Sequence, residues 1–305
     1  MRWLADFILH GRMQAIAVAA TSLMLSLLVP PLSLFAAAVV ALVTLYRGGR
    51  EGLNTLLGSA LAAGLLGAMA IGNFVLPAGY GLMLWLPTWG MALVLRHTGN
   101  LSWTFELLTV LGLIGIVAMY LISPDAAGFW RERMQQAFEA LKGPVGVSED
   151  LGPVPLEVLA RYMTGVVAAG MVSSLALSLL FARWWQALVA NPGGFKTEFL
   201  RLRLHRPMAY LTLALGAAGI VVEGQTREAV VNLLLVLAVV YVGVGTAVLH
   251  AIFSGRGQKF WLWGLYGLMV LVPHVLLPVA LVGLSDTWFD WRGRFVPLQT
   301  QRLKG

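Results

Sequence analysis

Apolar stretches of membrane-spanning length recur along almost the whole chain, and no other feature of the sequence constrains the fold as strongly. A helix that crosses a bilayer needs about 20 mostly apolar residues. Stretches of roughly that length, separated by charged residues or by Pro and Gly, cover residues 13–29, 32–46, 51–72, 74–95, 102–122, 156–181, 208–222, 228–252 and 258–284. These stretches predict an all-α fold, a polytopic transmembrane helix bundle that forms one integral membrane domain over residues 1–305.

The number of spans stays open between eight and nine. The stretches 32–46 and 208–222 are short, and Pro273 and Pro278 divide 258–284 into pieces too short to span alone. The composition fits a membrane location, because 59% of the residues are hydrophobic and 11% are charged, against about 45–50% and about 25% in a soluble domain. This composition excludes both a water-soluble globule and a disordered chain.

The distribution of Lys and Arg predicts a cytoplasmic N-terminus. With that orientation the cytoplasmic segments hold twelve Lys and Arg, and the outer segments before the tail hold five. Such an excess on one side marks the cytoplasmic face. The four Lys and Arg of residues 292–304 would lie outside if all nine stretches cross the membrane. The side of the C-terminus therefore stays open.

Searches for catalytic motifs argue against an enzyme and against a bound cofactor. The chain has no cysteine, no phosphate-binding G-x-x-x-x-G-K-[ST] loop and no His-Glu-x-x-His or Gly-x-Ser-x-Gly motif. Its five histidines are scattered without the spacing of metal ligands. The net charge of +7 comes from basic residues at span ends, where lipid headgroups explain them without nucleic acid.

Two apolar stretches are interrupted by Pro and Gly, which is typical of a solute site near the membrane midplane. Pro77 and Pro87 interrupt residues 74–95, and Pro273 interrupts residues 258–284. Broken helices need protein or a cavity around them, because lipid cannot satisfy freed backbone groups; simple kinked packing is the alternative. The candidate cavity residues are Tyr80, Trp85, Trp89 and His274, with the polar Asn73 and Asn232 towards outer span ends.

Two segments outside the spans are typical of the membrane interface. Within the outer loop 123–154, residues 130–141 have the pattern of an amphipathic helix. The loop 183–206, predicted to be cytoplasmic, combines a Trp pair with basic residues that could hold anionic lipid or a partner protein. The candidate contact residues there are Trp184, Trp185, Lys196, Arg201, Arg203 and Arg206.

Three blocks of sequence resemble the YybS-like family of uncharacterised bacterial membrane proteins, and the likeness extends over nearly the whole chain. These blocks are RGGREGL at 47–53, RWWQA at 183–187 followed by NPGGF at 191–195, EF at 198–199 and LRL at 202–204, and GLSDTWFDWR at 283–292. The resemblance implies a multi-pass protein of the bacterial inner membrane and supplies no catalytic residues.

The same family is grouped distantly with the substrate-binding components of energy-coupling-factor transporters, which dock on a membrane partner and two ATPases. Those components dock through an Ala-x-x-x-Ala helix face, and Ala15 and Ala19 have that spacing. They have six spans, so this chain departs from them in its predicted span number.

The sequence thus leads to two functional hypotheses. The first is a membrane protein that binds or helps to transport a small solute with energy from partner proteins. The alternative is a non-transporting scaffold that docks a cytoplasmic partner or anionic lipid through residues 183–206. Neither the solute, the direction of movement nor the oligomeric state follows from the sequence.

Overall fold

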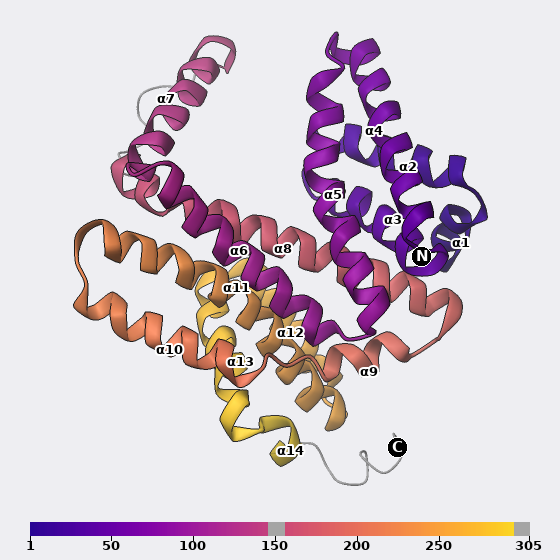
Figure 1. Cartoon of the computed structure of the whole chain (residues 1–305). Helices are drawn as coiled ribbons and strands as arrows, with labels where there is room; N and C mark the ends of the chain where they lie inside the picture. The colour runs from indigo at the N-terminus through magenta and orange to yellow at the C-terminus, as the bar shows by residue number, and fades with distance from the viewer. Residues whose placement is uncertain (146–155, 296–305) are drawn as a thin grey trace. The chain divides into compact units, whose positions relative to one another are not determined.

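The computed structural model describes residues 1–145 and 156–295, and every regular element within them is a helix (Figure 1). Residues 146–154 of the predicted outer loop and the tail from 296, with Arg302 and Lys304, lie outside the described residues. In chain order the helices are α1 Arg2–His10, α2 Arg12–Ser26, α3 Leu32–Arg47, α4 Gly49–Ile71, α5 Val75–Thr98, α6 Leu101–Ile122, α7 Ala126–Val145, α8 Leu156–Ala190, α9 Gly194–Leu200, α10 Arg206–Val221, α11 Gly224–Gly255, α12 Lys259–Leu271, the 3-10 turn η1 Pro273–Val275, α13 Leu276–Phe289 and α14 Trp291–Phe295.

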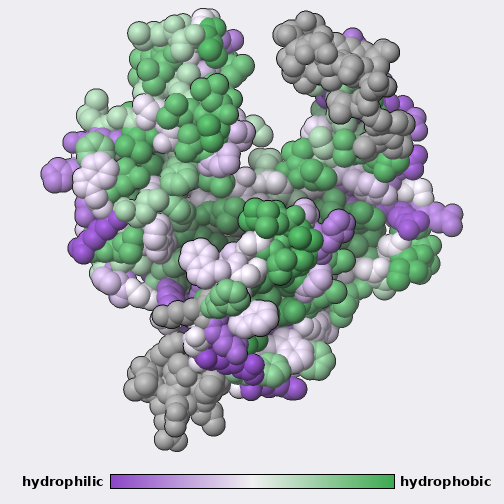
Figure 2. All heavy atoms as spheres, turned by 180° about the vertical axis from the view of Figure 1, so that it is seen from behind, coloured by the Kyte–Doolittle hydropathy of each residue, from purple (hydrophilic) through white to green (hydrophobic). Residues whose placement is uncertain are grey.

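The all-helical prediction is confirmed for the described residues, and each predicted apolar stretch coincides with a helix or a helix pair. Among the described residues, α4, α5, α6, α8 and α11 are long and apolar enough to cross a membrane. Residues 260–271 and 273–289 pass the same test together but are bent by 115° at their break. Figure 2 shows hydrophobic side chains over much of the face it presents, as lipid contact requires. The chain is therefore a helical membrane protein.

The helices form two compact units. The first unit comprises Met1–Leu108 and Ser173–Leu202, and the second comprises Thr109–Val172 and Arg203–Gly305. Both α6 and α8 contribute residues to each unit.

In the first unit, α3 is enclosed by other helices. Its residues 36–45 are all buried, and it packs against α2, α4 and α5. A helix that is apolar on every side belongs in a protein interior. We attribute its apolar composition to burial in protein rather than to exposure to lipid.

The carbonyl end of α3 is tied to neighbouring segments by side-chain donors. Arg96 donates through Nη1 to the carbonyl oxygen of Leu45 at 2.5 Å, and Gln186 donates through Nε2 to the same oxygen at 3.2 Å. Basic donors at this position complement the negative end of the helix dipole. Gly48, with φ +112°, then turns the chain into α4, where a Cβ on Gly52 would lie 2.0 Å from Thr44 Oγ1. The RGGREGL block is therefore a tight helix junction.

In the second unit, the closest helix packing joins α11 and α13. A Cβ on Gly245 would lie 1.9 Å from the carbonyl oxygen of Val279, and a Cβ on Gly283 would lie 2.3 Å from the carbonyl oxygen of Tyr241. Small residues on both faces let the backbones approach, which is how helices pack in membranes. Glycine at these two positions is therefore required by the packing.

Candidate functional site

A polar cavity of about 380 Å³ lies in the second unit, beside the connection between α6 and α7. It is formed by the end of α6, the start of α7, and the first turns of α8 and α11. The lining residues are Tyr120, Pro124, Asp125, Ala126, Ala127, Arg131, Arg161, Gln225 and Glu228. Because charged and polar side chains dominate this lining, the cavity suits a hydrophilic molecule.

The buried side-chain amide of Asn232 connects the helices that line the cavity. Its Nδ2, which carries two hydrogens, lies within hydrogen-bond distance of three acceptors: Tyr120 Oη at 2.8 Å, the Arg161 carbonyl at 2.9 Å and the Glu228 carbonyl at 2.8 Å. Its Oδ1 accepts the backbone N–H of Gly165 at 2.6 Å. The amide thus bridges Gly165 and Arg161, whose backbone groups pair with each other in an undisturbed helix. Asn232 therefore links α6, α8 and α11 at the site.

Gly165 makes this insertion possible. A Cβ at that position would lie 2.6 Å from Asn232 Oδ1 and 2.7 Å from Asn232 Cα. Contacts that short do not occur for real side chains, so any larger residue would push α8 away from α11. The glycine in the third turn of α8 is therefore part of the architecture of the site.

The charged groups of the lining differ in how well they are paired. Arg161 Nε and Glu228 Oε1 are 3.5 Å apart, which is longer than an aligned hydrogen bond. Asp125 accepts the backbone N–H of Gly128 through Oδ1 at 2.8 Å and so caps the start of α7. Arg131 Nε is buried and has no hydrogen-bond partner among the described residues. The site therefore contains one cationic donor that the described chain leaves unsatisfied.

Two further hydrogen bonds hold the α6–α7 connection and the start of α7 in place. Gln225 donates through Nε2 to the Pro124 carbonyl, and so joins the start of α11 to the α6–α7 connection. Trp130 Nε1 donates to Thr164 Oγ1 at 2.8 Å and holds α7 against α8. These contacts fix the position of the first turns of α7, which carry Arg131.

Four of the six predicted cavity residues belong to the first unit, where they have structural contacts. Asn73 Oδ1 accepts the N–H of Leu76 at 2.9 Å at the start of α5, and Trp89 Nε1 donates to the Gly49 carbonyl at 2.9 Å. Trp85 is fully buried, with no hydrogen-bond partner for its Nε1 among the described residues, and Tyr80 is partly exposed.

The other two predicted residues belong to the second unit. Asn232 is the one of the six whose hydrogen bonds, among those described, reach the lining of the polar cavity. His274 is exposed in η1, at the bend between α12 and α13. The sequence predicted a solute cavity at other segments, residues 74–95 and 258–284, and none of the residues that line this cavity was a candidate. Arg131 and Arg161 were counted only as outer charges, and their clustering depends on contacts between distant segments.

The predicted partner and lipid contacts divide into buried and exposed residues. Ala15 and Ala19 are buried within the first unit, so in this structure they serve internal packing and offer no docking surface. Trp185 is buried as well, in ring contact with Phe181 at a centroid distance of 4.7 Å, while Trp184 is half-buried. Lys196, Arg201 and Arg206 are exposed, and each makes no ion pair with any described residue.

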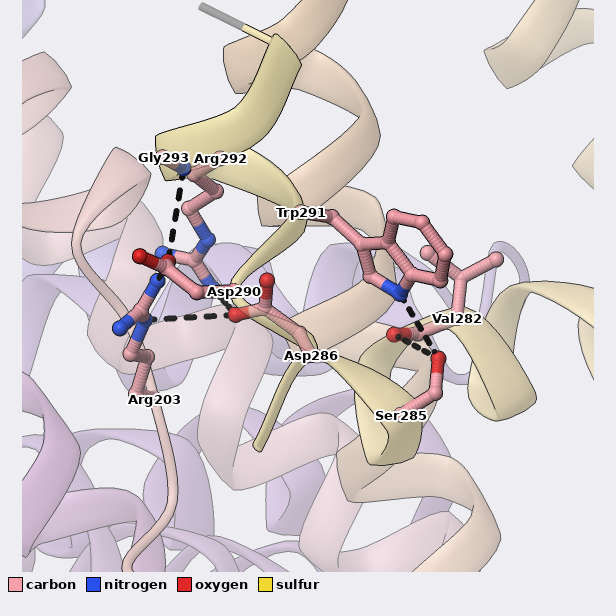
Figure 3. A network of polar contacts seen from close by, with 8 residues as sticks. All are labelled: Arg203, Val282, Ser285, Asp286, Asp290, Trp291, Arg292 and Gly293. Atoms are coloured by element: carbon pink, nitrogen blue, oxygen red, sulfur yellow. Dashed lines mark hydrogen bonds and ion pairs between the residues drawn. The ribbon is translucent and has the colours of Figure 1, made fainter. Parts of the chain in front are cut away.

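Arg203, the remaining predicted contact, belongs to an ion network at the end of α13 (Figure 3). Its Nε lies 3.2 Å from Asp286 Oδ2, and Arg292 Nη2 lies 3.4 Å from the same oxygen. These are ion pairs rather than aligned hydrogen bonds. Asp290 pairs with Arg203 and accepts the N–H of Gly293. The GLSDTWFDWR block therefore fastens residue 203 to the end of α13.

Burial and pairing shift the ionisation of this network. Burial lowers the pKa of Arg292 to about 10, so that it remains charged at neutral pH. The hydrogen bond from Arg203 lowers the pKa of Asp290 below its ordinary value. The network pairs two basic side chains, Arg203 and Arg292, with two acidic ones, Asp286 and Asp290.

No group of three or more His, Asp and Glu side chains in the described part of the chain could hold a metal ion. Comparisons with protein-family models, with curated protein sequences and with solved structures return no match, so the functional conclusion rests on the residues of the chain itself.

Proposed function

We propose that this protein binds a small polar solute in the cavity beside the α6–α7 connection, as a step in moving that solute across the membrane. The observation that carries the proposal is the buried Nε of Arg131, which has no partner among the described residues in a cavity of about 380 Å³. An unpaired buried donor costs roughly 1–3 kcal/mol, and a ligand acceptor would remove that cost.

The proposed membrane topology has eight spans with both termini in the cytoplasm. Arg203 belongs to the loop 183–206 that is predicted to be cytoplasmic, and its ion pair with Asp286 supports placing the end of α13 on that same side. The bend of 115° then makes α12 and α13 a re-entrant pair that enters and leaves from the cytoplasm. This topology also places Arg292 and Arg294 inside, in agreement with the positive-inside rule. The cavity would open to the outer side.

The topology can be tested with single cysteines, because the chain has none of its own. Thr226→Cys lies at the start of α11, on the proposed outer side, and Arg294→Cys lies in α14, on the proposed inner side. A membrane-impermeant maleimide applied to intact spheroplasts should label T226C and leave R294C unlabelled until the membrane is permeabilised. Labelling of R294C in intact spheroplasts would refute the re-entrant pair.

Solute binding can be tested with the protein in lipid nanodiscs. A panel of amino acids, organic acids, sugars, nucleosides and polyamines is screened by thermal shift, since a ligand stabilises the folded state by RT ln(1 + [L]/Kd). We expect at least one compound to stabilise the wild type and not Arg131→Gln. Arg133→Gln is the matched control, because Arg133 lies on the same helix, over the Phe129 ring and outside the cavity lining. A panel without any Arg131-dependent binder would contradict the proposal.

Energy for transport would come from partner proteins, because the sequence holds no nucleotide-binding loop. The resemblance to the YybS-like family of the bacterial inner membrane supports this division of labour, as the distantly grouped transporter components work with separate ATPases. Crosslinking in native membranes followed by recovery of ATPases would support this part of the proposal.

A second candidate function is a scaffold, and the exposed basic residues of the segment 196–206 favour it. In this segment Arg203 pairs with Asp286 and Asp290, and nearby Arg183 pairs with Glu198. The basic residues without an ion pair to a described residue are Lys196, Arg201 and Arg206. Anionic lipid or an acidic partner would attract such a segment. Replacing the three exposed residues by Gln should then remove a co-purifying protein or lipid without changing solute binding.

A further inference from the structure

We infer that the solute is a zwitterion of amino-acid size, bound through its carboxylate to Arg131 and through its ammonium group to the acidic side of the same cavity. This inference rests on the proposed function and adds the chemical class of the ligand. It follows from the balance of charge in the lining, from the pairing state of each charged group and from the volume of the cavity.

The lining carries equal positive and negative charge. Arg131 and Arg161 contribute two cations, and Asp125 and Glu228 contribute two anions. A ligand with a net charge of one unit would disturb this balance, because its charge would lie near the arginines if positive or near the carboxylates if negative. Like charges a few ångströms apart repel each other. A ligand that is neutral overall but carries both charges avoids that repulsion.

The positive end of the site is Arg131. Its Nε is buried without a partner among the described residues, and it lies in the second turn of α7, whose first residues Ala126 and Ala127 also line the cavity. The start of a helix favours negative charge through the helix dipole. A carboxylate is the acceptor whose geometry best matches the planar guanidinium, so this end would hold the carboxylate of the ligand.

The negative end of the site is formed by Glu228 with Asp125. Glu228 Oε1 lies 3.5 Å from Arg161 Nε, too far for a strong hydrogen bond, and an ionised carboxylate has about four acceptor positions. Glu228 therefore keeps acceptor capacity for an ammonium group. Asp125 uses Oδ1 to cap α7, which leaves Oδ2 able to accept as well.

The volume limits the size of the ligand. Pockets for small molecules have about 300–1,000 Å³, and the cavity at about 380 Å³ is near the lower limit. Tyr120 and Gln225 in the lining each make one hydrogen bond within the protein and keep polar capacity for a small ligand. A compound the size of one amino acid meets these limits.

The test uses wild-type protein in nanodiscs and isothermal titration with the twenty standard L-amino acids. For the amino acid that binds most tightly, the matched acid without its amino group and the matched amine without its carboxylate are titrated as well. We expect the amino acid to bind at least about tenfold more tightly than either analogue, because each lost charged hydrogen bond costs about that factor.

Two variants test which side chain binds the carboxylate of the ligand and which binds its ammonium group. Arg131→Gln should weaken the amino acid by about tenfold or more and leave the binding of the amine analogue unchanged, whereas Glu228→Gln should weaken the amino acid and leave the acid analogue unchanged. Arg133→Gln, the matched control, should change none of these affinities. An Arg131→Gln variant that weakens the amine analogue as much as the amino acid would overturn the assignment of the carboxylate.

The outcomes separate this inference from the proposed function. If an organic acid, sugar or nucleoside binds with dependence on Arg131 and no amino acid does, the zwitterion inference is wrong and the proposed function stands. Equal affinity for the amino acid and for one of its analogues would also overturn the inference. If no compound of the broad panel binds, both are wrong.

Discussion

Replacing Asp286 by Asn removes one charge from the centre of the ion network and keeps the size of the side chain. The Asp286 side chain is 1% exposed and pairs with Arg292, which is 10% exposed, and with Arg203, which is 46% exposed. In the variant, Arg292 stays buried and charged without its nearest counter-ion. The loss of stability should therefore come mainly from the buried pair.

The magnitude follows from the exposure of each partner. Breaking a buried ion pair by removing one partner costs about 3–5 kcal/mol, whereas an exposed pair contributes about 0–1 kcal/mol. The amide that replaces the carboxylate still has an oxygen able to accept a hydrogen bond from Arg292, which favours the lower value. We expect Asp286→Asn to lower the free energy of unfolding by about 3 kcal/mol.

Asp290→Asn is the matched control. Asp290 also pairs with Arg203, but its side chain is 57% exposed, and Asn tolerates its positive φ of 44° as well as Asp does. This variant should cost no more than about 1 kcal/mol. The double variant Asp286→Leu with Arg292→Met should recover most of the loss, because apolar residues replace a buried pair with little cost.

The assay is reversible unfolding in mixed micelles, followed by circular dichroism, for the wild type and the three variants. If Asp286→Asn and Asp290→Asn lose the same free energy within error, burial does not control the strength of the network, and the reasoning is wrong. If the double variant is less stable than Asp286→Asn, the cost does not arise from an uncompensated Arg292.

Three further predictions concern packing, the buried amide and pH. Gly283→Ala should destabilise the protein strongly in the same unfolding assay, because its Cβ would meet a carbonyl oxygen at 2.3 Å, whereas Gly79→Ala, with nothing within 4 Å of its Cβ, should be neutral or slightly stabilising. Asn232→Leu should cost at least about 1–3 kcal/mol, since it leaves buried backbone groups unpaired, and should also abolish solute binding. The lowered pKa of Asp290 means that its stabilisation is present above the ordinary value of 3.8 and is lost as the pH falls through the lower folded pKa. The difference in stability between wild type and Asp290→Asn, measured from pH 7 to 3, should therefore stay constant at first and shrink at the acidic end.

The helices could be predicted because the lipid environment imposes a simple rule on sequence. Every backbone group in hydrocarbon must be paired within the helix, so each apolar stretch between polar breaks became a helix, as in α4 and α6. The enclosure of α3 could not be predicted, because its apolar residues would be equally suitable for lipid contact and for burial in protein. That distinction depends on the packing of α2, α4 and α5 around α3, which the sequence pattern of α3 itself does not predict.

The candidate site was only partly predictable for a related reason. Asn232 was predicted as a polar group near an outer span end that could form hydrogen bonds with a solute, and the structure shows its amide bonded to groups of the protein. Two of these partners, Tyr120 and Arg161, are 112 and 71 residues away in the sequence. The charges around the cavity looked like ordinary headgroup contacts when each was considered alone. They form a cavity lining only because α6, α7, α8 and α11 come together there, and no short sequence motif predicts that packing.

The sequence blocks 47–53 and 283–292 and the cavity have separate roles in the molecule. RGGREGL closes the α3–α4 junction and GLSDTWFDWR closes the ion network, so substitutions there should reduce stability. None of the cavity-lining residues belongs to these blocks. Arg131→Gln should instead abolish binding while leaving stability unchanged or raising it by about 1 kcal/mol, because it removes a buried donor without a described partner. Functional sites often reduce the stability of the empty protein, so a loss of stability in Arg131→Gln would instead indicate a structural role for Arg131.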